Sequence, residues 1–299
     1  MEAIIHSLAF VIVILLAYFF KARGLMKSED GFTLTKIVYN ITLPATLLSS
    51  VRHFKIDAVF FTFIAIGFLL NVIFASVALF LTRKRPETTR AFAIYSLSGY
   101  NIGNFAIPFV ASVLPAAVPF IGLFDMGNAI MVTGGTTILL DRAIATEPPK
   151  ISSIFKKLLK APPFLTYILC IILSLLHLSL PSFVEFPLSF LSSANSFLSM
   201  FIIGLFLKFN LDKNYLKLAL NTLSWRYLLS TLAALAAWFF LPFPTPVKIA
   251  LLFAILAPVG NLGVMNATEF GSNEGKVGFT SSLSILISLV IMCLLLLLT

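Results

Sequence analysis

Long apolar runs separated by short polar segments fill the chain from one end to the other. Each run has about the 20 residues that an α-helix needs to cross the hydrocarbon core of a bilayer. The runs are continuous and do not alternate between apolar and polar positions, so they predict helices and not the strands of a β-barrel. The pattern predicts ten membrane-spanning helices, at residues 3–20, 33–51, 57–81, 90–114, 117–140, 162–180, 184–207, 220–241, 246–270 and 276–298.

The composition is typical of a protein whose main solvent is lipid. Of the 299 residues, 59% are hydrophobic and only 11% are charged, and the mean hydropathy is +1.03. A soluble domain is about 45–50% apolar and about 25% charged. The ten helices also leave no room for a separate soluble domain. The expected fold class is therefore an all-α polytopic membrane protein.

The basic residues predict the orientation of these helices. When the connections are assigned to alternate sides, all but three of the 21 Lys and Arg residues fall on one side, Arg226 among them. The three exceptions are Arg52, Lys55 and Lys248. Cytoplasmic loops are enriched in Lys and Arg. We therefore expect a multi-pass protein of the cell (inner) membrane with both termini on the non-cytoplasmic side. This distribution also accounts for the net charge of +9, so no nucleic-acid partner is expected.

The longest polar connection divides the helices into two sets of five. With an odd number of spans in each set, the second set must enter the membrane from the opposite side to the first. Such inverted repeats recur among secondary transporters. We therefore expect a first inverted repeat at residues 1–145, a cytoplasmic linker at 146–161 and a second inverted repeat at 162–299.

The fourth and ninth spans share one polar signature. Asn-Ile-Gly occurs at 101–103 and Asn-Leu-Gly at 261–263, and each span also contains a proline, Pro108 or Pro258. Glycine and proline do occur in ordinary membrane helices. Their presence with asparagine in the equivalent helix of both halves nevertheless predicts that both helices are broken. The alternative is that the asparagines only join helices by hydrogen bonds.

A broken helix inside a membrane is tolerated only where protein or a watery cavity covers the exposed backbone. The half-helix that starts after the break points its positive end into that cavity and suits an anion. Asn101, Asn104 and Asn261 can cap such helices and donate to a carboxylate. Gly103 and Gly260 permit backbone conformations that other residues resist. These five residues are the predicted anion site.

Ionisable residues inside membrane helices are costly and mark functional sites. Asp125 lies near the middle of the fifth span, with Asn128 one helical turn away. The pair is a candidate site for a coupling proton or cation, or alternatively a structural hydrogen bond between helices. Glu269, at the end of the ninth span, either contributes to that site or is a solvated helix-end carboxylate. Arg52, His53 and Lys55 could attract anions at the outer mouth, although a solvated loop is favoured.

Sequence signatures of catalysis are missing. The chain has no Gly-rich loop ending in Gly-Lys-Ser/Thr, no Gly-x-Ser-x-Gly segment and no His/Cys cluster with zinc spacing. Cys170 and Cys293 each lie inside an apolar run and are interpreted as packing residues. We therefore expect a protein that is not an enzyme, with no metal site and no cofactor other than Na⁺ or H⁺ as a coupling ion.

Two segments resemble the auxin efflux carrier family, which includes plant PIN-type auxin exporters and bacterial malate or malonate carriers. Asn-Ile-Gly-Asn-Phe-Ala-Ile-Pro at 101–108 looks like the Asn-containing, Ile-Pro-ending segment of that family. Ala-Pro-Val-Gly at 257–260, with Ala-Thr-Glu-Phe-Gly at 267–271, resembles its second crossover helix. Ten spans and outward termini also agree, so the likeness covers essentially the whole chain. The family is related to the bile acid–sodium symporter fold, whose members bind sodium near the equivalent crossover.

The resemblance implies a scaffold domain and a transport domain that work by an elevator-like motion. It implies that helices 4 and 9 cross near Pro108 and Pro258, and that these two prolines hold the crossing open and belong to the substrate site. It also implies that Asn101 contacts the substrate carboxylate there, and that the protein is a homodimer. Phe270 stands where plant members have Tyr, and the central loop is too short for a plant-type regulatory segment. A prokaryotic organic-acid carrier is therefore favoured over an auxin exporter.

The leading hypothesis is a secondary active transporter that moves a small organic anion by alternating access. Its substrate would be a carboxylate such as malate, malonate or an auxin-like acid. Protons, sodium or the membrane potential would drive it. The alternative is a membrane sensor or receptor that binds an anion in the same pocket without moving it. The expected partners are the anion and the lipid bilayer.

Overall fold

The computed structural model describes residues 2–50, 56–208 and 212–298. These residues are folded as helices and connections, with no β-strand among them. Within this part of the chain, five helical segments are long and apolar enough to cross a membrane. They are α4 (Ala58–Leu81), the run Pro115–Ala143, α11 (Ser182–Phe206), α12 (Lys213–Phe240) and α15 (Glu274–Leu298). The protein is therefore an all-helical polytopic membrane protein, as predicted.

Apart from the first, which is the single helix α1, the other predicted spans are made of shorter pieces. A sixth crossing results if α9 (Ile151–Leu158) and α10 (Pro162–Leu175), which meet at a bend of 76°, are taken together. The remaining elements are α1 (Glu2–Ala22), α2 (Ser28–Ile37), η1 (Val38–Thr42), α3 (Leu43–Ser49), α5 (Glu87–Leu97), η3 (Ile102–Ala106), α6 (Ile107–Val113), α13 (Thr245–Ile255) and α14 (Asn261–Glu269). Within Pro115–Ala143 lie η4 (Pro115–Ala117), α7 (Val118–Ile130), η5 (Met131–Gly135) and α8 (Thr136–Ala143). The count of ten spans and the inverted repeat stay predictions.

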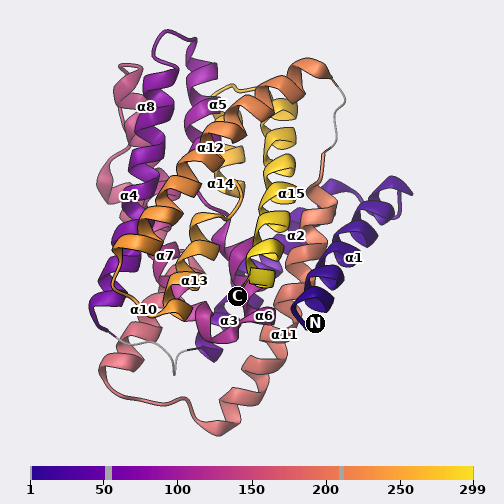
Figure 1. The fold of residues 1–299 in the computed structure, drawn as a ribbon, viewed down its shortest axis with the longest axis vertical. Coiled ribbons are helices and arrows are strands. Elements are labelled where there is room, and N and C mark those ends of the chain that lie inside the picture. The colour runs from indigo at the N-terminus through magenta and orange to yellow at the C-terminus, as the bar shows by residue number, and fades with distance from the viewer. Residues whose placement is uncertain (1, 51–55, 209–211, 299) are drawn as a thin grey trace.

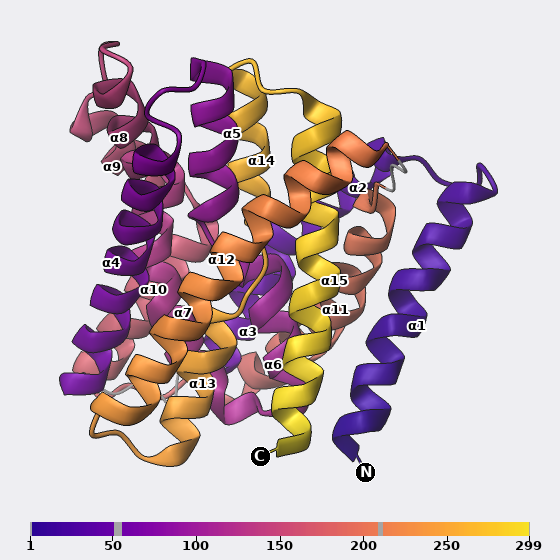
Figure 2. The same cartoon turned by 45° about the horizontal axis from the view of Figure 1, so that its top comes forward.

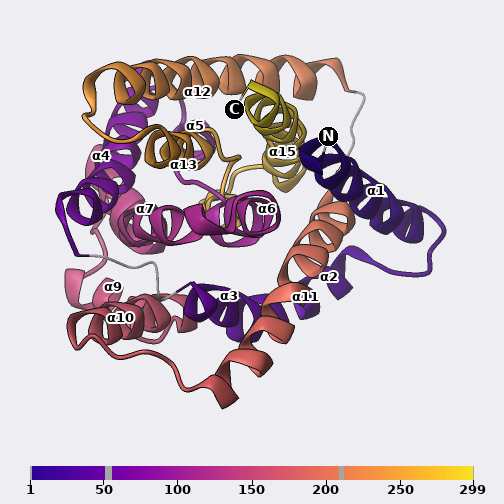
Figure 3. The same ribbon diagram turned by 60° about the horizontal axis from the view of Figure 1, so that its bottom comes forward.

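The helices are arranged as a wall on one side of a larger bundle. Helix α11 packs against α1, α2 and α3, and α10 packs against α3. We call these five helices, with η1 between α2 and α3, the wall, and the remaining described helices the bundle. Viewed from one end, α6 and α7 lie in the middle, with the wall on one side and α12, α13 and α15 on the other (Figure 3). The described ends of the chain, marked N and C, lie at the same end of the molecule (Figures 1 and 2).

The two predicted breaks are present, and they meet. Residues 98–101 separate α5 from η3, and residues 256–260 separate α13 from α14. Tyr100 and Val259 form an antiparallel bridge, and the Asn101 N–H donates to the Pro258 carbonyl at 2.9 Å. We call the meeting point of these two unwound segments the crossing.

The glycine and proline predictions need correction. The glycine that takes a left-handed conformation at the crossing is Gly99, with φ +77°, which the sequence analysis did not single out. Gly260 has an ordinary φ of −71°, and it matters because a Cβ there would lie 3.2 Å from the Tyr100 carbonyl oxygen. A Cβ on Gly103 would lie 2.9 Å from Leu43 Cδ2. Both residues therefore allow close approach and do not supply unusual backbone angles.

Proline 108 does not lie at the crossing but inside α6. It follows the π-helical turn η3, and Pro44 follows the π-helical turn η1 in the same way. Proline has no N–H to donate to the carbonyl four residues earlier, which belongs to Asn104 and Asn40 respectively. The local widening into a π-turn is a usual response to such a missing bond.

Helices α4 and α7 approach each other very closely at two glycines. A Cβ on Gly67 would lie 2.1 Å from the Phe124 carbonyl oxygen, and one on Gly127 would lie 2.1 Å from that of Ile64. Small residues permit such backbone contact between membrane helices, where van der Waals packing replaces the hydrophobic effect as the driving force. The contact fixes α7, which carries Asp125 and Asn128, against its neighbour.

We predict that Gly127→Ala destabilises the protein, because the new methyl group meets backbone atoms of α4 that cannot rotate away. Overpacking of this kind costs about 1–3 kcal/mol. Gly278→Ala is the matched control, since its Cβ would meet the flexible Lys208 side chain at 3.1 Å. The thermal unfolding midpoint of purified protein in detergent measures both. Equal midpoints for the two variants would contradict the close-packing argument.

Candidate functional site

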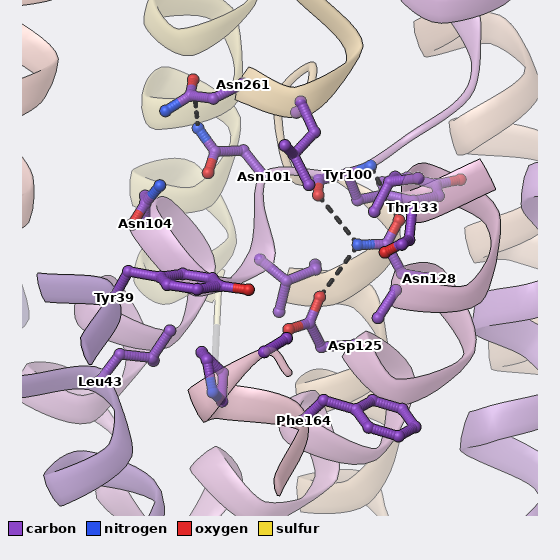
Figure 4. Close-up of a pocket in the computed structure, with 18 of the residues that line it drawn as sticks. Tyr39, Leu43, Tyr100, Asn101, Asn104, Asp125, Asn128, Thr133, Phe164 and Asn261 are labelled. Atoms are coloured by element: carbon purple, nitrogen blue, oxygen red, sulfur yellow. Dashed lines mark hydrogen bonds between the residues drawn. The ribbon is translucent and has the colours of Figure 1, made fainter. Parts of the chain in front are cut away.

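A cavity of about 420 Å³ lies between the wall and the crossing (Figure 4). This volume is within the range of small-molecule binding sites. The wall contributes Thr35, Lys36, Tyr39, Asn40, Leu43, Pro163, Phe164 and Tyr167 to its lining. The opposite side contributes Tyr100, Asn101, Gly103, Asn104, Asp125, Asn128, Thr133, Gly260 and Asn261. Most of the predicted site residues therefore face one cavity.

All three π-helical turns of the described chain line this cavity. Segment η1 brings Tyr39 and Asn40, η3 brings Gly103 and Asn104, and η5 brings Thr133. A π-turn re-aims side chains and leaves part of the helical hydrogen-bond ladder irregular, and such turns are frequent at functional sites. Their convergence from three separate helices indicates a binding site rather than a packing defect.

Two helices begin at the cavity. Helix α14 starts at Asn261, directly after Gly260, and η3 starts at Ile102, directly after Asn101. The first N–H groups of a helix have no partner within the helix, and the helix dipole makes this end positive. Both helix starts therefore favour a negatively charged group in the cavity.

Three asparagine amides gather beside these helix starts. Asn101 Nδ2 donates to Asn261 Oδ1 at 3.4 Å, and Asn104 Oδ1 is buried with no partner in the described chain. Figure 4 shows the three side chains on the same side of the cavity. The prediction that they cap the helices is wrong, because neither the start of η3 nor that of α14 has a side-chain cap. The amides face the cavity instead, where their N–H groups can donate to a carboxylate.

Asp125 occupies a different part of the cavity and joins its two sides. Its Oδ1 accepts a hydrogen bond from Asn128 Nδ2 at 2.9 Å, and its Oδ2 accepts one from the Tyr167 hydroxyl, also at 2.9 Å. Asp125 belongs to α7 and Tyr167 to α10 of the wall. Any sliding of the bundle along the wall must break this second bond.

Asn128 holds the unwound backbone at the crossing. Its Oδ1 accepts from the Tyr100 N–H at 3.1 Å, and its Nδ2 donates to the Tyr100 carbonyl at 3.0 Å. Asn71 of α4 binds the preceding residue, because its Oδ1 accepts from the Gly99 N–H at 2.7 Å. Unwound backbone inside a membrane needs such partners. The structural alternative therefore describes Asn128 well, and Asn71 is its companion.

Arg226 is the most important residue that the sequence analysis misplaced. It was counted with the basic residues of one membrane side, but it is fully buried in α12, with no exposed surface. Its guanidinium donates to the carbonyls of Gly99 (2.9 Å), Ala257 (3.0 Å) and Pro258 (3.2 Å), and to that of Leu97. The usable signal was an ionisable residue near the middle of an apolar span, the same signal that pointed to Asp125.

Some predicted residues do not join the cavity. Glu269 is exposed at the end of α14 and is not part of the cavity lining, so the structure does not bring it to Asp125. Pro258 lies at the crossing, but behind the cavity surface. The Pro108 carbonyl accepts from Ser196 Oγ of the wall at 2.8 Å.

Two further sets of residues complete the comparison with the sequence. The predicted basic group Arg52, His53 and Lys55 lies outside the described residues. Tyr39 and Tyr167 line the cavity although no sequence pattern singled them out. Within the described chain, no group of three or more His, Cys, Asp and Glu side chains is placed to hold a metal ion.

The sequence of the whole chain is similar to that of known membrane proteins. The family model described as "Membrane transport protein" matches residues 3–296. The chain belongs to the auxin efflux carrier family of membrane transport proteins. The resemblance found in the sequence is thus confirmed, and the family is one of transport and not of catalysis.

One relative is an uncharacterized transporter of Methanocaldococcus jannaschii. It is 28% identical to this chain over 210 residues, which cover 65% of this chain and 66% of the relative. Its name agrees with a transport function and says nothing of what is carried.

We predict that Asn128→Ala destabilises the crossing, because it removes the partners of the Tyr100 backbone. Each buried group left unsatisfied costs about 1–3 kcal/mol. Asn214→Ala, at an exposed position in the first turn of α12, is the matched control. Unfolding midpoints in detergent should fall clearly for Asn128→Ala and stay unchanged for the control. An unchanged midpoint for both would show that the amide of Asn128 does not support the backbone.

Proposed function

We propose that this protein is a secondary active transporter of a small organic anion, and that the anion binds in the cavity between the wall and the crossing. Membership of a membrane transport family supports the reaction class. The observation that supports the anion is the meeting of two helix starts and three asparagine amides at one cavity. Lys36 also lines the cavity and adds a positive charge at its exposed edge.

A carboxylate suits this site better than a neutral solute. It offers only acceptor atoms, while the helix starts and the Asn101 and Asn104 amides offer donors. Tyr39, Leu43 and Phe164 on the wall supply apolar surface for the remainder of a small acid (Figure 4). Malate and malonate are short dicarboxylates, and auxin-like acids are monocarboxylates with an aromatic body. All of them offer a carboxylate, so the substrate class extends over them.

The position of the cavity supports an elevator-type alternating access. One face of the cavity belongs to the wall and the other to the bundle, so a displacement of the bundle along the wall carries the anion site with it. In this proposal the wall is the scaffold domain, the bundle is the transport domain, and the scaffold forms the homodimer. The Asp125–Tyr167 hydrogen bond, which links wall and bundle at 2.9 Å, is broken and remade in each cycle.

Asp125 is the proposed site of the coupling cation, a proton or sodium. A carboxylate in the same cavity as an anionic substrate repels it, because two like charges in a poorly hydrated site each disfavour the ionised form of the other. Binding of a cation at Asp125 removes this repulsion. Anion and cation therefore favour each other's binding, which is the requirement for coupled transport.

The proposed location is the cell (inner) membrane, with both termini on the non-cytoplasmic side. The excess of Lys and Arg in alternate connections supports this orientation. The placement of both described ends at one end of the molecule is compatible with it (Figure 2).

The substrate site is tested by counterflow in proteoliposomes loaded with malate. Labelled mono- and dicarboxylates and indole-3-acetate are offered outside, and we expect at least one to accumulate. Asn101→Ala removes a donor to the carboxylate, and hydrogen bonds to charged groups are worth about 1.5–3 kcal/mol. Uptake at low substrate concentration should therefore fall by about tenfold or more. Asn214→Ala is the control and should transport normally.

Binding of a carboxylate without any counterflow by folded wild-type protein would favour the sensor alternative over transport. Normal counterflow by Asn101→Ala would show that the substrate does not bind at the crossing, although the protein is a transporter.

The coupling site is tested with Asp125→Asn. We expect this variant to lose uptake driven by a proton or sodium gradient, down to the level of protein-free liposomes, while exchange of labelled for unlabelled anion continues. The reason is that an amide keeps the size of the side chain but does not take up a proton and has no negative charge to attract sodium. Gradient-driven uptake with unchanged pH and sodium dependence would contradict the assignment.

A further inference from the structure

Arg226 binds the crossing from the side opposite to the cavity. Its guanidinium reaches the first unwound segment at Gly99 and the second at Ala257 and Pro258. It also lies over the ring of Tyr100, with 4.9 Å between the guanidinium carbon and the ring centroid. Tyr100 also lines the cavity and Arg226 does not, so Arg226 lies one residue behind the cavity surface.

The carbonyls that Arg226 binds belong to the C-terminal ends of two half-helices. Leu97 is the last residue of α5, and Ala257 follows α13, which ends at Ile255. Each helix C-terminus carries about −0.5 elementary charge, so two converging ends carry about −1. Neither α5 nor α13 has a basic residue in its last turn. The guanidinium, with one positive charge, balances the pair.

Among the described residues, no carboxylate forms an ion pair with Arg226. In the part of the chain that the structure describes, all of its hydrogen-bond acceptors are backbone carbonyls. A buried charge is expensive unless it is paired. Here the guanidinium is paired with the backbone carbonyls at the C-terminal ends of the two half-helices. The broken helices and the buried arginine therefore stabilise each other.

This balance determines the electrostatic character of the cavity. Four helix ends meet at the crossing, two positive ones at η3 and α14 and two negative ones at α5 and α13. Left alone, they would largely cancel. In many secondary transporters, unwound carbonyls and half-helix C-termini instead hold a bound cation such as Na⁺. With Arg226 on the negative ends, the two positive ends that face the cavity act on a ligand without opposition from those negative ends.

We propose that Arg226 is a tethered cation that takes the place of a bound metal cation at the crossing and makes the adjoining cavity selective for anions. It touches no ligand and is a positioning residue. The part of this inference that concerns anion binding rests on the proposed function. The part that concerns the crossing does not.

The first experiment compares Arg226→Lys with Arg226→Gln in the absence of substrate. Lysine keeps the charge without the guanidinium fork, and glutamine keeps hydrogen-bonding capacity without the charge. We expect the unfolding midpoint of Arg226→Gln to fall below that of Arg226→Lys by about 5 °C or more. Arg142→Gln, at an exposed position in the last turn of α8, is the control and should match wild type. An Arg226→Gln midpoint equal to or above that of Arg226→Lys would overturn the tethered cation.

The second experiment is chemical rescue of Arg226→Ala. Guanidinium and urea have nearly the same shape, but only guanidinium is charged. At low millimolar concentration, far below the denaturing range, guanidinium should raise the unfolding midpoint of Arg226→Ala, and urea should not. Wild type and Arg142→Ala should respond to neither. If Arg226→Ala fails to fold alone, its recovery with guanidinium but not urea throughout purification gives the same answer. The proposal would be refuted if guanidinium and urea raised the midpoint of Arg226→Ala equally, or if neither compound raised it.

Counterflow then tests anion selectivity. We expect Arg226→Gln to raise the KM for the transported anion by at least tenfold relative to Arg226→Lys, with a smaller effect on kcat. Equal KM values for the two variants would overturn the claim that Arg226 makes the cavity selective for anions. The role of Arg226 at the crossing would still be decided by the unfolding experiments. Absence of counterflow by wild type would instead refute the proposed function, and the rescue experiment would still decide the role of Arg226 at the crossing.

Discussion

Unwound backbone inside a membrane must find hydrogen-bond partners within the protein, and this requirement organises the molecule. The two segments at the crossing expose carbonyls and N–H groups that lipid cannot satisfy. Arg226 donates hydrogen bonds to the carbonyls, including those of Gly99, Ala257 and Pro258. Asn128 forms hydrogen bonds with both the N–H and the carbonyl of Tyr100, as a neighbouring β-strand would. The helices that carry these side chains are thereby held around the crossing, which is why α7 and α12 pack where they do.

The hydrogen bonds that satisfy the unwound backbone also separate the negative helix ends from the positive ones at the crossing. The negative helix ends lie against a buried guanidinium, and the positive ends open into the cavity. The amides of Asn101 and Asn261 lie on the positive side, and Asp125 lies beyond them. One cavity thus contains a part suited to an anion and a part suited to a cation. Coupled transport needs this proximity, because each ion then changes the binding free energy of the other.

The same cavity is the boundary between the wall and the bundle. Tyr167 reaches across it to Asp125. The π-turns η1 and η3 contact each other, and Gly103 of η3 comes close to Leu43, the residue directly after η1. A carrier must hold its substrate firmly and still move it. In the proposed carrier, the rigid partners at the crossing would move as a unit, and the hydrogen bond between Asp125 and Tyr167 would break.

The sequence by itself determined the solvent, the helical fold class, the two breaks and the family, because apolar run length and the paired Asn-x-Gly segments are local properties of the chain. It also singled out Asn101 and Asn261 for an anion site and Asp125 for a coupling site, as separate predictions. Only the tertiary structure decided what surrounds them. It moved Arg226 from a membrane surface to the centre of the protein, removed Glu269 from the site and added Tyr167. These decisions depend on which helices lie side by side, and that follows from long-range packing and hydrogen bonding, which no local pattern encodes.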